Sequence, residues 1–106
     1  MMKKAMISQP MGGLTKDEML KIRDAAKAEL EALGYQVLDT VFPSFDNEFG
    51  LMDPDHIALL HLGKSLEEMA KCDLVYFCEG WQDKRGCRIE HSAATAYGIK
   101  AMYQGK

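Results

Sequence analysis

The chain has 106 residues and a formal net charge of −3, with 47% hydrophobic and 27% charged residues. This composition is typical of an ordinary soluble domain, and the acidic balance argues against general nucleic-acid binding. No apolar run approaches the roughly 20 residues that cross a bilayer, so no membrane association is expected. The three cysteines form no CxxC motif and fit reduced thiols in the cytoplasm. We therefore expect one cytoplasmic domain over residues 1–106.

Hydrophobic periodicity divides the chain into alternating strands and helices. The four predicted strands are Ala5 to Ile7, within the segment from Lys3 to Ser8, and Tyr35 to Leu38, Leu74 to Cys78 and Ala101 to Tyr103. Three helices are predicted between them, from the capping box Thr15-x-x-Glu18 to Gly34, from Asp53 to Lys71 and from Cys87 to Gly98. Gly63 and a second box at Ser65-x-x-Glu68 leave open whether the middle helix is divided.

This alternation indicates an α/β fold with a parallel sheet, right-handed crossovers and helices on both faces. We predict the strand order 2-1-3-4, in which the first and third strands are neighbours. Open α/β sheets bind ligands where the strand order reverses, beyond the carboxyl ends of the strands. The loops 9–13 and 80–90 should meet at that point.

Two loops invite more than one interpretation. The bare amides of Gly12 and Gly13, together with the following helix N-terminus, suit an anion, but an ordinary tight connection explains the same glycines. The segment from 39 to 52 has no regular period, and its aromatic residues Phe42, Phe45 and Phe49 either cover a flat ligand or belong to the core.

Glu90, in the first turns of the last predicted helix, is the candidate catalytic residue. A carboxylate held ionised by the helix dipole can attack a sugar at its anomeric carbon and form a covalent glycosyl-enzyme. A surface or capping carboxylate is the alternative. Lys84, Arg85 and Arg88 are expected to concentrate positive charge beside it, either as an anion clamp or as a solvated face.

The other polar and aromatic residues of this stretch carry weaker signals. Trp81 either stacks on a base or anchors its loop, and Asp83 offers a further acid. His91 has no partner that the sequence identifies, which favours a structural or solvated side chain. The three histidines lack the spacing of metal ligands, so neither a metal nor another cofactor is expected.

Three motifs, ISQPMGGLT, LGKSLEEMAKCD and GWQDKRGCRIEHSAATAYG, resemble a small domain family of unknown function from bacteria and phages. That family is similar to the nucleoside 2-deoxyribosyltransferases and the deoxynucleoside 5′-monophosphate N-glycosidases. The resemblance implies a flavodoxin-like three-layer α/β/α fold, a glutamate nucleophile, and a homodimer or larger homo-oligomer. Gly86, Glu90 and Ala94 match the nucleophile motif, and Gly12 and Gly13 match a glycine pair beside the 5′-phosphate.

Three positions depart from the pattern of these relatives. An aromatic hydroxyl of the relatives falls on Ala5, the aspartate that assists the departing base falls on Ser65, and a residue at the sugar 5′ end falls on Lys84. The loss of the acid weakens the leaving-group end, because general acid catalysis contributes about 10²–10⁴ in rate. A lysine at the 5′ end suits a phosphate.

The resemblance implies an N-glycosidase or deoxyribosyltransferase that acts on a (deoxy)nucleoside or its 5′-phosphate, not on polymeric nucleic acid. The alternatives are a non-catalytic module that senses or sequesters a nucleotide, and a partner-binding protein with a vestigial crevice. Glu90 and Ser65 are the expected catalytic residues. The expected substrate-binding residues are Ser8, Gln9, Gly12, Gly13, Trp81, Lys84, Arg85, Gly86 and Arg88.

Overall fold

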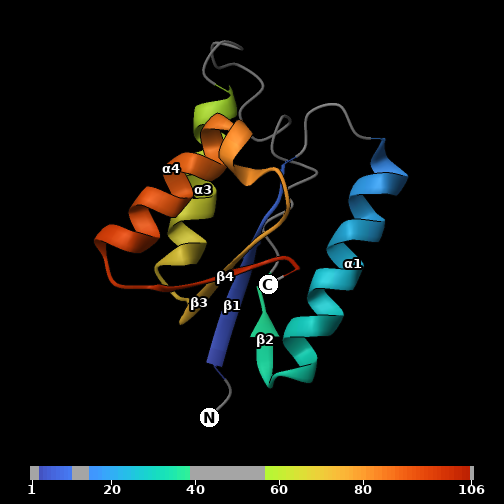
Figure 1. The fold of residues 1–106 in the computed structure, drawn as a ribbon. Helices are drawn as coiled ribbons and strands as arrows, with labels where there is room; N and C mark the ends of the chain where they lie inside the picture. The colour runs from blue at the N-terminus through green and yellow to red at the C-terminus, as the bar shows by residue number, and fades with distance from the viewer. Residues whose placement is uncertain (1–2, 11–14, 39–56, 106) are drawn as a thin grey trace.

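A parallel sheet lies between helices on both faces in the computed structural model, which describes residues 3–10, 15–38 and 57–105 (Figure 1). The strands are β1 (Lys3–Ser8), β2 (Tyr35–Val37), β3 (Leu74–Phe77) and β4 (Lys100–Tyr103). The helices are α1 (Lys16–Ala32), α3 (Ile57–Met69) and α4 (Arg85–Ala96), and a 3₁₀ turn over Trp81–Asp83 precedes α4.

The strand order is β2-β1-β3-β4 and every pairing is parallel, which confirms the predicted order and the flavodoxin-like α/β architecture. In the register of the two central strands, Ala5 is paired with Leu74 and Ser8 is paired with Phe77. Figure 1 shows α1 on one side of the sheet and α3 with α4 on the other. The crossover from β1 therefore leaves toward one face and the crossover from β3 toward the opposite face, so the order reverses between these two strands.

Two apolar clusters fill the space between the sheet and its helices. The cluster under α1 contains the buried residues Ala5, Ile7, Ala26, Leu30, Leu74, Tyr76 and Cys78. The cluster under α3 and α4 contains Met6, Met69, Val75, Phe77 and Ala94. Alternate residues of β1 and β3 thus face opposite sides, as expected of a sheet that is covered on both faces.

The predicted ends of α1 are confirmed. The Thr15 side chain accepts a 3.1 Å hydrogen bond from the backbone N–H of Glu18, and the Glu18 carboxylate accepts one of 3.1 Å from the backbone N–H of Thr15. This reciprocal pair satisfies two amides that a helix start leaves open. Gly34 follows the helix with a φ of +92°, a conformation that favours glycine.

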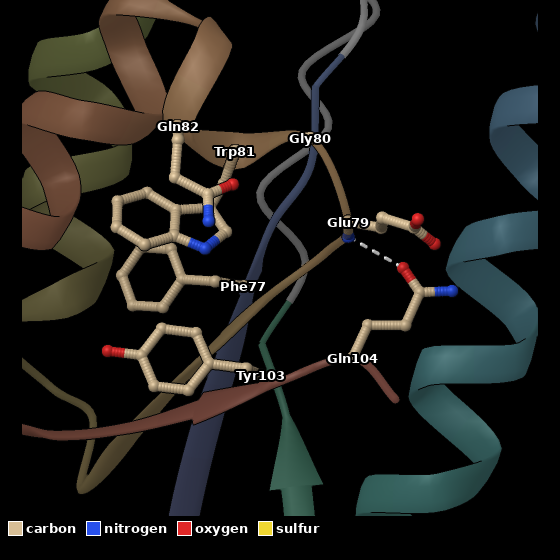
Figure 2. Close-up of a pocket in the computed structure, with 7 residues that line it drawn as sticks. All are labelled: Phe77, Glu79, Gly80, Trp81, Gln82, Tyr103 and Gln104. Carbon is tan, nitrogen blue, oxygen red and sulfur yellow. Dashed lines mark hydrogen bonds between the residues drawn. The ribbon is translucent and has the colours of Figure 1, made fainter. Parts of the chain in front are cut away.

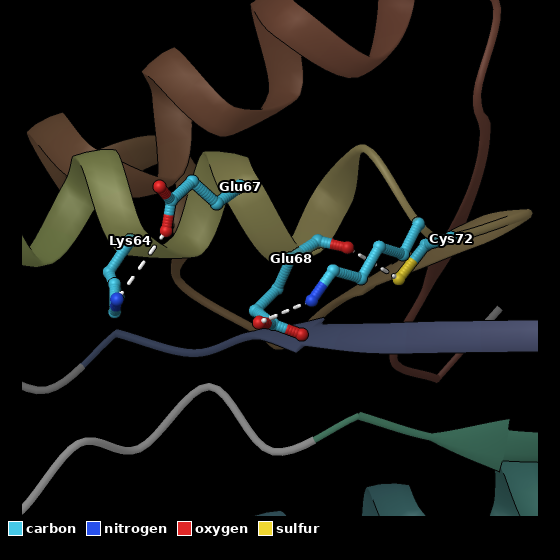
Figure 3. Close-up of polar contacts among 5 residues, drawn as sticks. Lys64, Glu67, Glu68 and Cys72 are labelled. Atoms are coloured by element: carbon cyan, nitrogen blue, oxygen red, sulfur yellow. Dashed lines mark hydrogen bonds and ion pairs between the residues drawn. The ribbon is translucent and has the colours of Figure 1, made fainter.

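The helix α3 runs without interruption through Gly63, which settles the question of its division. Lys64 lies 3.6 Å from Glu67 on this helix (Figure 3), and Lys71, two residues after its end, lies 3.3 Å from Glu68. The predicted start of this helix at Asp53 lies outside the described residues, as does the segment from 39 to 52.

The helix α4 begins at Arg85, two residues before the predicted start at Cys87. Arg85 and Gly86 are therefore helical, whereas the sequence analysis placed them in a loop. The helix start was missed because Lys84 occupies the N-cap with an extended backbone and no side-chain hydrogen bond, so no Ser, Thr, Asp or Asn signal marks it. Within the described ranges, no helix has the length and apolar character that a membrane crossing requires.

Candidate functional site

The Glu90 carboxylate is buried at the point where β1, α3 and α4 meet. Its Oε1 accepts a 2.7 Å hydrogen bond from the Ser8 hydroxyl, at the end of β1. The Ser65 side chain, from α3, also acts on this carboxylate, whose pKa it lowers as a hydrogen-bond partner. Glu90 is 7% exposed and Ser8 is 1% exposed. The structure therefore brings together three residues that the sequence analysis proposed for the site, from three separate segments of the chain.

Burial raises the pKa of Glu90 above its ordinary value of 4.5, and the hydrogen bonds from Ser8 and Ser65 oppose that rise. The sequence predicts an ionised Glu90 from the helix dipole, which acts mainly within the first turn of a helix. Glu90 is the sixth residue of α4, which begins at Arg85, so it lies in the second turn. Burial and the two hydroxyl groups, rather than the dipole, govern its ionisation.

Cys87 is a neighbour of Glu90 that the sequence analysis did not single out. Burial raises the pKa of its thiol and the negative charge of Glu90 raises it further, while a hydrogen bond with Ser8 and the positive charge of Lys84 lower it. Its three-residue spacing from Glu90 places both side chains on one face of a helix, and this signal could have identified it.

A pocket of about 400 Å³, here called the switch-point pocket, lies at the carboxyl ends of β1 and β3. It is lined by Gln9, Pro10, Ile22, Cys78, Glu79, Gly80, Asp83, Lys84 and Gln104. The loops after β1 and β3 approach closely here: Gly80 has a φ of +90°, and a Cβ at this position would lie 3.7 Å from Pro10 Cγ. Gln9 is held in place because its Nε2 donates a 2.7 Å hydrogen bond to the Met19 carbonyl. The described parts of the two loops therefore do meet.

Glu90 does not line this pocket, but it is linked to the pocket wall through its neighbours. Ser8, which binds Glu90, directly precedes the lining residue Gln9. The negative charge of Glu90 raises the pKa of the Cys87 thiol, and the positive charge of the lining residue Lys84 lowers it. The carboxylate thus lies behind the wall at the end of β1.

The three basic residues do not form a common clamp around Glu90. Lys84 lines the switch-point pocket. Arg85 and Arg88 are exposed on α4, and at about 100° per residue they lie roughly 140° and 160° around the helix from Glu90. The solvated-face interpretation therefore describes the two arginines better than the clamp does.

Within the part of the chain that the structure describes, Trp81 forms an aromatic cluster with Phe77, His91 and Tyr103. The Trp81 and His91 rings stack with a centroid distance of 4.2 Å, and His91 Nε2 lies 2.7 Å from the Tyr103 hydroxyl oxygen in a hydrogen bond. His91 therefore has partners that the sequence did not identify, and the structural alternative, rather than the solvated one, describes its side chain. Its partners lie in the 3₁₀ turn and in β4. Contacts between separate elements of this kind produce no regular spacing in the sequence.

A second pocket, of about 260 Å³, opens beside this cluster and is here called the aromatic pocket. It is lined by Phe77, Glu79, Gly80, Trp81, Gln82, Tyr103 and Gln104 (Figure 2). Gln104 Oε1 accepts a 2.7 Å hydrogen bond from the backbone N–H of Glu79. Glu79, Gly80 and Gln104 line both pockets, which therefore lie side by side at the carboxyl edge of the sheet.

The remaining predicted site residues are the glycines. Gly12 and Gly13 lie outside the described residues. Gly86 lies in the first turn of α4, and a Cβ there would meet nothing within 4 Å, so no close contact requires glycine at this position. Among the residues that the structure describes, no group of three or more His, Cys, Asp or Glu side chains is arranged to hold a metal ion.

Comparison with known proteins gives one match. No curated protein and no solved structure matches the chain significantly. The model of a family described as a domain of unknown function (DUF4406) matches residues 3–103. This match includes every described strand and helix, from the start of β1 to the end of β4. The chain therefore belongs to the DUF4406 family.

Proposed function

We propose that this domain is an N-glycosidase or deoxyribosyltransferase that cleaves the N-glycosidic bond of a (deoxy)nucleoside or its 5′-phosphate, with Glu90 as the nucleophile. One observation carries the proposal: the Glu90 carboxylate is buried, yet it is oriented by hydroxyl groups from two other elements. Burying a carboxylate costs free energy, and titratable groups with perturbed pKa values cluster at functional sites.

The chemistry needs a carboxylate that is held in one orientation. Ser8 and Ser65 restrain Glu90, and its remaining lone pairs would attack the anomeric carbon once the pocket wall at the end of β1 moves aside to expose the carboxylate to the substrate. The carbon–nitrogen bond then breaks, and the sugar is held as an ester of Glu90. Water attacks the ester to release the free sugar, with one of its protons passing to the departed base. A second base in place of water gives glycosyl transfer.

The switch-point pocket supports the substrate class. Its volume of about 400 Å³ lies within the usual range of roughly 300–1,000 Å³ for small-molecule sites. Lys84 lines it and can bind a phosphate or another anionic group. Asp83 and Glu79 also line it, and either carboxyl group can assist a departing base where this chain has Ser65 in place of the aspartate of the resembling enzymes.

A non-catalytic nucleotide-binding module is the second candidate, and one contact favours it. Ser65 is a hydrogen-bond partner of Glu90, so its hydroxyl group acts on the carboxylate rather than on the departing base. A hydroxyl group is also a poor general acid. Without an acid at the base end, the same pocket would retain a nucleotide without turnover.

Base release from a panel of nucleosides and 5′-nucleotides, with and without a second base as acceptor, tests the enzymatic proposal. We expect release by the unaltered protein and a loss of more than about 10³-fold in Glu90→Gln, as when a nucleophile is removed. Glu67→Gln, an exposed glutamate on α3, is the matched control and should retain activity. No release by the unaltered protein, or equal release by Glu90→Gln, would contradict the proposal.

Calorimetry with the same panel separates the binding module from the enzyme. Tight binding with the ligand recovered intact, abolished in Lys84→Glu, would support the module. A ligand at 100 times its dissociation constant adds about 2.7 kcal/mol of stability, so the melting temperature would rise measurably. If no nucleotide shifts it, a partner-binding protein with a vestigial crevice becomes the better explanation.

We also propose a cytoplasmic homodimer or larger homo-oligomer, on the strength of the resemblance to the deoxyribosyltransferases and of the three free cysteines. Light scattering coupled to size-exclusion chromatography measures the oligomeric state directly. A monomer at all accessible concentrations would contradict this part of the proposal.

A further inference from the structure

The aromatic pocket has the size of a ring system rather than of a whole nucleotide. An engineered apolar cavity of about 150 Å³ holds benzene, whereas complete ligands occupy roughly 300–1,000 Å³. At about 260 Å³ the aromatic pocket accepts one ring or two fused rings. It shares Glu79, Gly80 and Gln104 with the switch-point pocket, and its other lining residues are different.

Three aromatic side chains from separate elements form one wall of this pocket. Phe77 ends β3, Trp81 begins the 3₁₀ turn and Tyr103 ends β4. The Phe77 ring centroid lies 5.3 Å from that of Trp81 and 5.9 Å from that of Tyr103. Figure 2 shows the three rings one after another along one side of the pocket, with Glu79 and Gln104 on the other.

His91 holds this wall in place from outside the pocket. It stacks on Trp81 with a centroid distance of 4.2 Å and forms a 2.7 Å hydrogen bond with the Tyr103 hydroxyl. Trp81 and Tyr103 nevertheless remain partly exposed, whereas Phe77 is fully buried. A wall that is already ordered loses little conformational entropy when a ligand stacks on it.

The polar groups of the pocket restrict the charge of its ligand. Glu79 contributes a carboxylate, and Gln82 and Gln104 contribute amides that can hydrogen-bond to the edge of a ring. No lysine or arginine is among the described residues that line it. Aromatic faces and a carboxylate attract cations and repel anions. This pocket therefore differs from the switch-point pocket, where Lys84 favours an anionic group.

We propose that the aromatic pocket binds a planar nitrogen heteroaromatic ring that is uncharged or cationic. The ring stacks on the partly exposed rings of Trp81 and Tyr103, which the buried Phe77 ring supports, and the Gln82 and Gln104 amides contact its edge. The site does not include Glu90, so it does not depend on the proposed glycosidic chemistry.

Trp81 is the only tryptophan of the chain, so its indole N–H gives one resonance that reports on this pocket. The probes are nicotinamide and the cation 1-methylnicotinamide, which are planar, with benzoate as the planar anion and cyclohexanecarboxamide as the non-planar amide. We expect the two heteroaromatic probes to move the Trp81 resonance in a saturable way at millimolar concentrations. The two control probes should leave it in place.

Substitutions locate the site and test its charge preference. Gln82→Ala, at an exposed position, should weaken the binding of both heteroaromatic probes several-fold. Glu79→Gln should weaken binding of the cation 1-methylnicotinamide relative to that of uncharged nicotinamide, which should still bind. Tyr97→Phe, at an 84% exposed tyrosine of the α4 C-cap, is the matched control and should change nothing.

Several outcomes would overturn the proposal: no saturable shift with either heteroaromatic probe, an equal shift with the non-planar amide, or unchanged affinity in both the Gln82 and Glu79 variants. Glu90→Gln should bind the probes as the unaltered protein does. Because base release measures Glu90 and the indole resonance measures the aromatic pocket, failure of one result leaves the other interpretable.

Discussion

The Ser8 hydroxyl donates a 2.7 Å hydrogen bond to Glu90 although 82 residues separate the two in the sequence. The sheet explains the contact. Ser8 ends β1, and β1 pairs with β3, the strand that leads into α4. Because Met6 belongs to the cluster under α3 and α4, Ser8, two residues later, faces the same side. The hydrogen bond therefore connects the end of β1, where the strand order reverses, to the candidate nucleophile.

Removing the charge of Glu90 should stabilise the protein at neutral and alkaline pH. A carboxyl group whose pKa is raised by folding contributes stability below its unfolded pKa, near 4.5, and that contribution is lost as the pH rises through the raised folded pKa. At pH 8, Glu90→Gln should therefore unfold with a free energy higher by roughly 0.5–2 kcal/mol. Denaturant titrations at several pH values measure this difference.

At acidic pH, below the ordinary pKa of 4.5, the Glu90→Gln variant and the unaltered protein should have nearly equal stability. Comparing the two proteins at each pH cancels the contributions of all other carboxyl groups. Glu67→Gln, at an exposed position, should show no such divergence. A difference that is constant with pH would mean that burial does not raise the Glu90 pKa.

Ser8 and Glu90 should be energetically coupled. Ser8→Ala removes a hydrogen bond to a buried carboxylate, and bonds of this kind contribute about 1.5–3 kcal/mol. The cost should be largest at pH 8, where Glu90 is most ionised, and smaller in the Glu90→Gln background. A double-mutant cycle at pH 8 should give a coupling energy of at least about 0.5 kcal/mol. Ser92→Ala, at an exposed serine of α4, should give none.

The three thiols should react slowly in the folded protein. Burial, the largest cause, raises the pKa of Cys72 and of Cys78 to about 11, and it raises the pKa of Cys87 as well. Cys72 also donates a 3.3 Å hydrogen bond to the Glu68 carbonyl, and the Glu68 carboxylate raises its pKa further (Figure 3).

Because the thiolate is the reactive form, alkylation of Cys72 and Cys78 at pH 8 should be roughly 100-fold slower than that of an exposed thiol. Mass spectrometry after timed iodoacetamide treatment measures the rate. The unfolded protein should label at all three cysteines within the time that labels a free thiol. Rapid labelling of the folded protein would show that these thiols are not buried as described.

The start of α1 should depend on its capping box. Thr15→Ala should lower the free energy of unfolding by about 1 kcal/mol, since it leaves the Glu18 backbone N–H without its acceptor. Thr15→Ser retains the acceptor oxygen and should cost much less. Thermal and denaturant unfolding of both variants would measure this, and equal losses would show that the hydroxyl group does not contribute.

The sequence predicts the fold well where local signals agree with the tertiary structure. The capping box at Thr15, the glycine after the helix at Gly34 and the alternation of strands and helices each have a local physical cause, and the alternation indicates the parallel sheet, whose order in the structure is the predicted 2-1-3-4. The start of α4 at Arg85 could not be predicted in the same way. Lys84 supplies no capping side chain, so packing rather than local chemistry defines this helix end.

The candidate site was predictable only in part. The presence of Glu90 and Ser65 near each other follows from the resemblance and the topology, but their direct contact depends on how α3 packs against α4. The hydrogen bond between His91 and Tyr103 likewise joins a helix to an edge strand. Such contacts depend on side-chain directions across elements, which no periodicity along the chain encodes.

The shortness of β2 has a consequence for self-association. This edge strand pairs with β1 over three residues, from Tyr35 to Val37. A strand from another molecule could pair there with only three residues, which is too short a stretch to build a continuous sheet between molecules. The other edge strand, β4, pairs with β3 over only four residues, so oligomers of this domain should assemble through helices and loops rather than by extending the sheet at either edge.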